Sequence, residues 1–377
     1  MNNISYIQNC YGCGVCVIAC VKKIIDLRLN NDGFYEPYIQ EIDKCTNCGQ
    51  CVAVCSYIDD EPAIEPQKVI SYATWSENQS VRKESSSGGL GYEIGRFLLS
   101  KGYQVCGVKY NTKLNRAEHF MTTELEDWKW SQGSKYIKSY TLEGFKYITR
   151  KGKFFVTGTP CQIDSLRRYI KKNKIEDNFI LLDFFCHGVP SFLLWDKYVQ
   201  DNREKVGAIS HAGWRNKKIG WHNSYMISLI GDKSTHESLF TNGDIFYRFF
   251  LGNYCLNKPC YQKCKFKYLS SSADLRIGDM WGKKYANNDD GVTSLIAFTN
   301  KGCSILEEID GCHLQKESVK DSTEGQYKKP LKEPFIRKMV INALKGTKPL
   351  QLIHSFYCKP YMLLMIPKRV LKKITKR

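Results

Sequence analysis

After residue 68, short apolar runs alternate with stretches whose apolar positions recur at helical spacing. The strands predicted in this region cover residues 68–75, 105–110, 154–156, 179–185, 225–230, 273–278 and 292–298. The helices predicted between them include residues 90–98, 161–170 and 246–251. This alternation is typical of α/β architecture, in which helices cover the faces of a largely parallel sheet. We therefore expect an α/β fold for most of the chain.

The first 55 residues follow a different pattern, in which two copies of C-x2-C-x2-C-x3-C hold eight of the chain's 17 cysteines. Three thiolates at this spacing surround one face of an iron–sulfur cube, and the fourth reaches across to the other cluster. The spacing predicts two 4Fe-4S clusters. The expected ligand sets are Cys10, Cys13, Cys16 with Cys55, and Cys45, Cys48, Cys51 with Cys20.

Two other interpretations of these cysteines are weaker. A zinc site needs only four ligands and seldom uses a third cysteine two residues on. A disulfide framework needs an oxidising compartment. Val21 and Ser56 replace the proline that usually follows the fourth cysteine, which changes the turn but removes no ligand. Residues 1–60 are thus expected to form an α+β ferredoxin-like domain, ending at the acidic, proline-containing linker 61–66.

The charge of the 377-residue chain is +18 and is unevenly distributed. Residues 1–66 carry four Lys/Arg against nine Asp/Glu, whereas the last 44 residues carry eleven basic residues and no acidic one. This basic tail, residues 331–377, suits an anionic membrane surface, an acidic partner or a solvated helix end. Nucleic acid ranks last because the sequence holds no recognisable nucleic-acid module. Without a secretory leader, we expect the protein in the cytoplasm, with peripheral contact at the inner face of the membrane as one interpretation.

Several polar positions have the chemistry of a cofactor site. The segment Ser85–Gly89 precedes a helix and suits a phosphate, although such loops often only connect elements. Lys135 and Tyr136 suit a phosphate or a flavin face, and Lys135 is equally compatible with a solvated surface. The carboxylates of Asp274 and Asp279 can bind a hydroxyl or a ring edge, with a turn cap favoured for Asp274. The catalytic group is unknown, and His187 and His222 are weak candidates for proton donors.

Four later cysteines are candidates for a third cluster. Cys161 and Cys186 each follow a predicted strand, where the carboxyl ends of parallel strands form a ligand crevice. Cys260 and Cys264 lie together in KPCYQKC, with Cys255 as a competitor for one ligand position. The alternative is that they are buried free cysteines, which behave as small hydrophobes. Other cysteines are expected to pack in the core: Cys106, Cys303, Cys312 and Cys358.

Taken in order, these motifs resemble the beta-subunit family of coenzyme F-420 hydrogenases and dehydrogenases. The matching strings are the double cysteine motif, SSSGG, GSKYI, GTPCQ, FFCHG, KPCYQKC and ADLRIGDMWG. The resemblance implies an iron–sulfur flavoprotein with an N-terminal-type domain over 68–150 and a C-terminal-type domain over 151–330. It implies FAD contacts at Ser86, Ser87, Gly88, Gly89, Lys135, Tyr136 and Asp279, and it favours the third cluster at Cys161, Cys186, Cys260 and Cys264. Related proteins space the last pair more tightly by one residue, which keeps Cys255 as an alternative ligand.

The segment GWRNKKIGWHN looks most like copies found among bacterial polysaccharide-synthesis genes. The resemblance implies an oxidoreductase that passes electrons between 4Fe-4S clusters and FAD. Its expected donor is reduced ferredoxin, a deazaflavin or another carrier, and its expected substrate is a small molecule or sugar. The alternatives are an electron-transfer adaptor for a partner enzyme and a redox- or iron-sensing scaffold. Turnover by the purified, flavin-loaded protein separates the first hypothesis from the other two.

Overall fold

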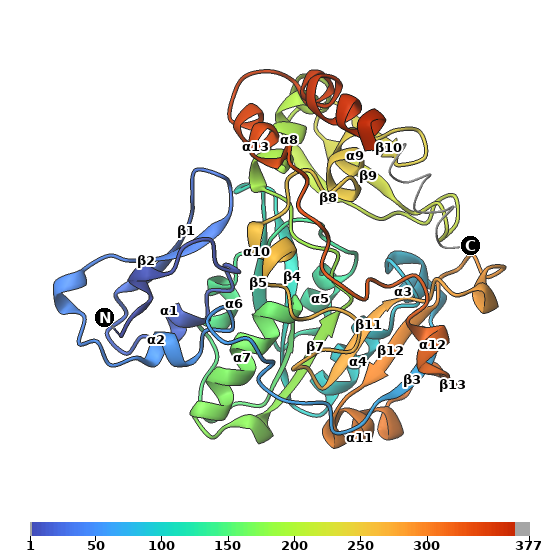
Figure 1. Cartoon of the computed structure of the whole chain (residues 1–377). Helices are drawn as coiled ribbons and strands as arrows, with labels where there is room; N and C mark the ends of the chain where they lie inside the picture. Colours follow the sequence, from blue (N-terminus) through green and yellow to red (C-terminus); the bar gives the residue numbers. More distant parts are fainter. Residues whose placement is uncertain (1, 366–377) are drawn as a thin grey trace.

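The computed structural model describes residues 2–365 as a small N-terminal unit beside a larger α/β body (Figure 1). The N-terminal unit contains an antiparallel hairpin and two short helices, which is the α+β arrangement expected for a ferredoxin-like domain. Its elements are η1 (Ile4–Tyr6), α1 (Val15–Ala19), β1 (Ile25–Leu29), β2 (Tyr35–Ile39), η2 (Ile42–Lys44) and α2 (Gln50–Ala53).

The two cysteine motifs fold in the same way. Gly14 begins α1 with φ of 75°, and Gly49 begins α2 with φ of 74°. Glycine tolerates this left-handed conformation, so the chain can turn sharply after the second cysteine of each motif. Cys16 and Cys51 then occupy the second position of their helices. The repeated spacing thus produces two equivalent cysteine loops.

The α/β body is built on an eight-stranded sheet in the order β13-β3-β12-β11-β7-β6-β4-β5. The four neighbours β11, β7, β6 and β4 run parallel, and the strands on both sides of them pair antiparallel. The strands are β3 (Ile70–Ser76), β4 (Gln104–Asn111), β5 (Arg116–Thr122), β6 (Phe154–Thr157), β7 (Phe179–Phe184), β11 (Leu275–Asp279), β12 (Thr293–Ala297) and β13 (Cys312–Glu317). Strands from 68–150 and from 151–330 share this sheet, and the division at residue 150 stays a prediction.

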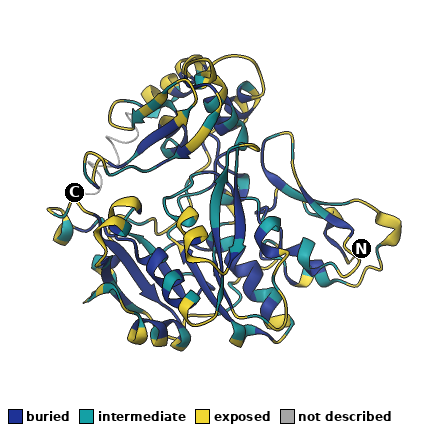
Figure 2. Ribbon diagram, turned by 180° about the vertical axis from the view of Figure 1, so that it is seen from behind, coloured by how far each residue is buried: buried dark blue, intermediate teal, exposed yellow. Residues whose placement is uncertain are grey.

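Helices cover both faces of the sheet, so its central strands are buried on each side (Figure 2). Along β6, Phe154 and Val156 pack on one face while Phe155 packs on the other, as the twofold periodicity of a strand requires. The helices α4 (Leu90–Ser100) and α11 (Asn300–Glu308) contribute to the core on the Phe155 side. The opposite side is covered by α7 (Pro160–Lys172) together with Val15, Ala19 and Val54 of the ferredoxin-like unit. The N-terminal unit is therefore part of the core on that face.

A second lobe lies above the sheet in Figure 1 and has its own core. It combines the antiparallel strands β8 (Ile209–Gly213), β9 (Met226–Gly231) and β10 (Thr235–Leu239) with four helices. These helices are α8 (Phe192–Val206), α9 (Ile245–Leu251), α13 (Arg337–Leu344) and α14 (Leu350–Ile353), the last continuing into the π-helical turn η6 (His354–Cys358). Large aromatic side chains dominate this core, including the fully buried Trp195, Trp214 and Tyr247.

Short elements connect these layers. They are α3 (Gln79–Glu84), α5 (Leu125–Trp128), η3 (Lys129–Ser131), α6 (Leu142–Phe145), η4 (Glu176–Asn178), α10 (Lys258–Gln262), η5 (Lys283–Tyr285) and α12 (Val319–Ser322). Over residues 2–365, no helix has the length and apolar character needed to cross a membrane.

Candidate iron–sulfur and cofactor site

The first thiol group lies inside the ferredoxin-like unit. Cys10, Cys13 and Cys16 line a small cavity together with Cys55 of the second motif, which is the crossed set expected from the spacing. Burial raises the pKa of Cys13 to about 11, and the neighbouring Cys55 thiol adds to this shift. Metal binding requires thiolates, so iron would have to displace these protons. Cavity and donor chemistry together fit one 4Fe-4S cluster.

The second thiol group lies nearer the surface. Cys20 interacts electrostatically with Cys51, and both pack with Cys45 in the small core of the unit. The side-chain amide of Asn3 donates to the sulfur of Cys45 at 3.6 Å. Cys48 is exposed, so this group opens toward solvent. Any electron exchange with another protein is therefore easiest at this end.

The structure brings Cys161, Cys186, Cys260 and Cys264 together. Cys161 opens α7 directly after β6, and Cys186 follows the neighbouring parallel strand β7. The Cys260 thiol interacts electrostatically with the other three thiols. Burial raises the pKa of Cys186 to about 11, against the opposing effect of the Lys267 ammonium. Four thiols from three segments thus converge at the carboxyl edge of the sheet.

The extra residue between the last two cysteines does not separate them. Cys260 lies in α10, and the backbone N–H of Lys263 still donates to the carbonyl of Pro259 at the end of that helix. Residues four apart in such a turn lie on the same side. Cys255, the alternative ligand, is fully buried and interacts with Cys358 and Arg337 instead. Cys255 therefore packs in the upper lobe.

Among residues 2–365, no three His, Cys, Asp or Glu side chains are arranged to hold a single metal ion. A four-iron cube distributes its thiolates over four irons and needs a wider arrangement.

The loops that carry these cysteines contact one another. The hydroxyl of Tyr11, next to Cys10, donates to the carbonyl of Lys263, next to Cys264. The side-chain amide of Asn257 donates to the carbonyl of Cys10 at 3.0 Å. The first and third thiol groups are therefore neighbours across one interface.

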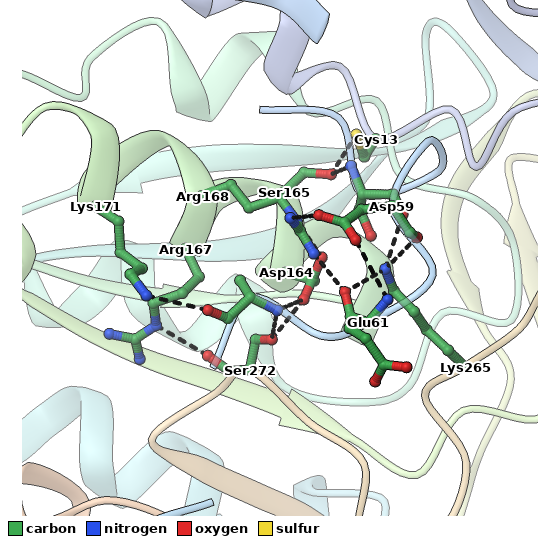
Figure 3. A network of polar contacts seen from close by, with 12 residues as sticks. Cys13, Asp59, Glu61, Asp164, Ser165, Arg167, Arg168, Lys171, Lys265 and Ser272 are labelled. Carbon is green, nitrogen blue, oxygen red and sulfur yellow. Dashed lines mark hydrogen bonds and ion pairs between the residues drawn. The ribbon is translucent and has the colours of Figure 1, made fainter. Parts of the chain in front are cut away.

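Figure 3 shows a polar network that fixes the ferredoxin-like unit on the body. The Lys265 ammonium donates to the carbonyls of Ser56, Asp59 and Glu61 at 3.0, 2.7 and 2.7 Å. From α7, the hydroxyl of Ser165 receives hydrogen bonds from the Cys13 thiol and the Ser56 N–H, each at 3.2 Å. These contacts hold the cysteine loops at a fixed separation.

A cavity of about 510 Å³ opens at the carboxyl ends of the parallel strands. Cys186 lies in its wall, so the third thiol group borders it directly. Most of the cofactor residues expected from the sequence also line it, namely Ser86, Ser87, Gly89, Lys135, Tyr136 and Asp279. The volume falls in the range of roughly 300–1,000 Å³ that is usual for ligand pockets.

Gly88 has a different role from the one expected, because it does not line the cavity. A Cβ atom built there would lie 2.3 Å from the carbonyl oxygen of Thr74. The Gly88 N–H already donates to the hydroxyl of Thr293 at 2.8 Å. Glycine is needed here for the close approach of the loop to β3 and β12.

The amino end of α4 faces the cavity through Gly89, Leu90 and Gly91. The first backbone N–H groups of a helix have no intrahelical acceptor and carry partial positive charge, which suits a phosphate. Beside it, the Lys135 ammonium donates to the carbonyls of residues 130, 131 and 132. Desolvation by burial lowers the pKa of Lys135 to about 7.

Arg215 organises the other side of the cavity, and sequence reasoning did not identify it. Its guanidinium donates to Asp279 at 2.9 Å, to the Tyr136 hydroxyl at 3.2 Å and to the carbonyl of Ser86 at 3.1 Å. Asp279 also accepts from the indole N–H of Trp221 at 2.9 Å. The available signal was the string GWRNKKIGWHN, which contains Arg215 and Trp221. Arg215 thereby connects three predicted cofactor residues.

The two candidate histidines lie in different environments. His187 lines the cavity, and burial lowers the pKa of its imidazole. His222 lies outside the cavity lining and packs against Trp221. Asp274 is structural, since it accepts from the Leu181 N–H at 2.7 Å and from the Thr299 hydroxyl at 2.8 Å. Of the two histidines, only His187 is placed to contact a bound molecule.

Comparisons with known proteins identify two segments of the chain. Residues 151–321 match the family model for the C terminus of the coenzyme F420 hydrogenase/dehydrogenase beta subunit, and residues 9–57 match a 4Fe-4S dicluster domain. Solved structures that resemble the chain include one from the xenon-derivatised F420-reducing NiFe hydrogenase complex of Methanosarcina barkeri. It is 16% identical with a TM-score of 0.49, over 68% of this chain and 84% of that chain. No curated protein matches the chain.

Proposed function

Because the chain belongs to the coenzyme F420 hydrogenase/dehydrogenase beta-subunit family and begins with a 4Fe-4S dicluster domain, we propose that it is an iron–sulfur flavoprotein oxidoreductase. It passes electrons between its clusters and FAD held in the 510 Å³ cavity, and thereby reduces or oxidises a small organic molecule. Relationship to hydrogenase and dehydrogenase subunits is consistent with this reaction class.

The observation that carries the proposal is the succession of three thiol groups from the surface to the cavity. The second thiol group described above is the outer one, which opens to solvent at Cys48, and the first is the middle one, which includes Cys13. The third thiol group is the inner one, and it borders the cavity at Cys186. The Tyr11 contact joins the loops of the middle and inner groups. Such an arrangement suits single-electron transfer between the surface and a buried cofactor.

The cavity residues fit FAD. The amino end of α4 and Lys135 would supply positive charge for the diphosphate, while Tyr136 and Phe250, whose rings stack on each other, would form an aromatic wall for the flavin ring. Bound flavin would exchange one electron at a time with clusters and two with an organic substrate. Arg215 and Asp279 would orient the ligand, and His187 would hold a proton at its imidazole.

The proposed donor and substrate are those that the family resemblance implies. Reduced ferredoxin, a deazaflavin or another carrier would deliver or accept electrons at the Cys48 end. The substrate would be a small molecule, of the sugar type if the chain acts in polysaccharide synthesis. We propose a cytoplasmic location, where thiolate ligands persist. Contact with a membrane is a separate proposal that depends on the C-terminal helices.

Anaerobic purification with iron, sulfide and flavin quantification tests the assignment. We expect about twelve irons and one FAD per chain, since each cube holds four irons. Cys161→Ser should reduce the iron to about eight and block reduction of the flavin by dithionite-reduced ferredoxin. Cys303→Ser, a packing cysteine on the other face, is the matched control. Full flavin with eight irons in the wild-type protein would refute the third cluster, and protein without flavin after reconstitution would refute the flavoprotein.

Turnover distinguishes the enzyme from an adaptor. The purified holoprotein should oxidise an artificial donor with an added acceptor at a rate that depends on bound flavin. Activity that appears only after addition of a partner enzyme would instead support the adaptor.

A further inference from the structure

The last helical segment of the chain is apolar on two opposite sides. From Leu350 it runs through α14 and the π-helical turn to residue 365. Its inner side, including Leu350, Ile353 and Cys358, is fully buried in the core of the upper lobe. This burial fixes the orientation of the segment.

The outer side of the same segment is also apolar. Leu352, Phe356 and Leu363 are 46%, 62% and 61% exposed. They recur at intervals of four and seven residues and therefore follow one stripe along the helix. In Figure 1 the segment lies at the outer end of the upper lobe, and nothing in residues 2–365 covers this side. Four other apolar side chains before and within α13 and in the same segment are also exposed: Phe335, Met339, Met362 and Leu364. We call these seven residues the outer apolar face.

Lys348 lies beside the outer apolar face, and the sequence of this end of the chain is basic. The Lys348 ammonium lies 5.3 Å from the ring centroid of Phe356, and Lys359 follows within the same segment. From Pro334 to the end, the sequence holds eleven basic residues and no acidic one, six of them after residue 367. The preceding carboxylate, Glu333, is 3.6 Å from Arg337 and accepts from Gln262, so it does not offset this charge.

We propose that the outer apolar face docks on the surface of an anionic phospholipid bilayer. Isolated exposed apolar residues are common, but three that share one stripe of a helical segment, with four more exposed within residues 335–364, are of the kind that marks an interaction site. A bilayer interface accepts Phe and Leu side chains without requiring a complementary pocket. Its negative surface potential attracts basic residues, and of the lysines described in this region, Lys348 lies beside Phe356 whereas Lys345 is paired with Asp32. The combination of an apolar patch and a basic tail supplies the two signals that stable surface attachment needs.

The proposal is independent of the flavin and the third cluster. It places the upper lobe on the membrane, so that the cavity wall contributed by Tyr225 and Phe250 lies in the membrane-bound lobe. The ferredoxin-like unit packs on the sheet and touches the upper lobe through its hairpin, at residues 32–34, while its cysteine end stays accessible to a soluble donor (Figure 1). Attachment would therefore leave the electron entry at Cys48 free.

Flotation with vesicles tests the proposal on the full-length holoprotein. One set of vesicles contains only phosphatidylcholine, and the other contains phosphatidylcholine with phosphatidylglycerol. We expect binding to the anionic set at low salt, with at least tenfold weaker binding to the neutral set. The variant Phe356→Gln/Leu363→Gln keeps the charge unchanged and should bind the anionic vesicles at least tenfold more weakly. Leu125→Gln, which changes a 40% exposed leucine on α5, is the matched control and should bind like the wild type.

Iron and flavin content of each variant verifies that it is folded. Equal binding to both sets of vesicles would overturn the role of charge. Unchanged binding by the double glutamine variant would overturn the role of the outer apolar face. If neither set floats the protein but the double variant turns a dimer into a monomer in sedimentation, the face belongs to a second copy of the chain. Binding to soluble polyglutamate with no binding to vesicles would assign it to an acidic protein, and either result rejects the membrane.

Discussion

Replacing Arg276 with methionine tests how the sheet holds the loop of the inner thiol group. Arg276 on β11 is paired in register with Asp183 on β7, and both are fully buried. The guanidinium donates from Nε and Nη2 to the two carboxylate oxygens, each at 2.6 Å. Its remaining nitrogen, Nη1, donates to the carbonyls of Phe266 and Tyr268 at 3.3 and 2.8 Å. One side chain therefore both compensates a buried charge and fixes the loop after Cys264.

Removing one partner of a buried ion pair costs about 3–5 kcal/mol, because the other charge is left uncompensated. Each kcal/mol lowers the Tm of a large domain by about 2 °C, so we expect Arg276→Met to melt about 6–10 °C below the wild type. Burial raises the pKa of Asp183 even beside the guanidinium. Without Arg276 its folded pKa rises further above the unfolded value, so the destabilisation should shrink as the pH falls and the carboxyl is protonated.

Thermal unfolding with parallel iron analysis measures both effects. The double variant Asp183→Leu/Arg276→Met removes the stranded charge and should recover most of the stability. It lacks the two loop hydrogen bonds, so both variants should hold about eight irons where the wild type holds about twelve. Lys101→Met, which breaks an exposed pair with Glu308 at 3.2 Å, is the control and should cost less than about 1 kcal/mol. An Arg276→Met protein with the same Tm as the Lys101→Met control would refute the reasoning.

Three further changes probe the cavity, the inter-unit contact and a buried histidine. Lys135→Met should weaken FAD binding about tenfold, since a charged hydrogen bond contributes about 1.5 kcal/mol or more. Equilibrium dialysis measures this affinity, and an unchanged affinity for FAD would contradict the prediction. Ser165→Ala removes the hydroxyl 3.2 Å from the Cys13 sulfur and should make one cluster potential more negative in a redox titration, with the other clusters unchanged. Burial lowers the pKa of His119 to about 4, so the unfolded state binds more protons between about pH 4 and 6.5 and stability rises with pH there. His119→Gln should therefore reduce the loss of unfolding free energy between pH 7.5 and 5.5 by about 1.3 kcal/mol in urea titrations, and an unchanged loss would count against it.

Local signals predicted the parts of the fold that bury a continuous apolar run. The strands around Phe155 and Ile180 and the helix opened by Cys161 are where the spacing placed them. The edge strands β5 and β13 escaped prediction because polar residues interrupt their apolar pattern, including the buried Glu118 and His119 in β5. The pairing of β13 with β3 also joins segments that lie far apart in the sequence. For the same reason the largely parallel sheet expected from sequence is mixed, with β12 antiparallel to β11.

Prediction of the candidate site likewise depended on whether the signal lay within one segment. Spacing within one segment predicted the crossed group that Cys55 forms with the first motif in a shared cavity, and the assignment of all eight N-terminal cysteines as ligands stays a prediction. Arg215 could not be assigned, because its role depends on Asp279 and Ser86 arriving from other parts of the chain. The close approach of Gly88 to Thr74 was also missed, since sequence does not show that Thr74 lies against it.

The segment that is longer by one residue also joins the third thiol group to the first. Lys263 belongs to the segment between Cys260 and Cys264 that is longer by one residue than the spacing expected from the resemblance. Its carbonyl accepts the hydroxyl of Tyr11, which is buried directly beside Cys10. The Tyr11 ring also packs edge-on against Phe266, with centroids 5.9 Å apart. A shorter loop would have to supply this acceptor from elsewhere, so the unusual spacing and the packing of the ferredoxin-like unit on the body are linked features of this chain.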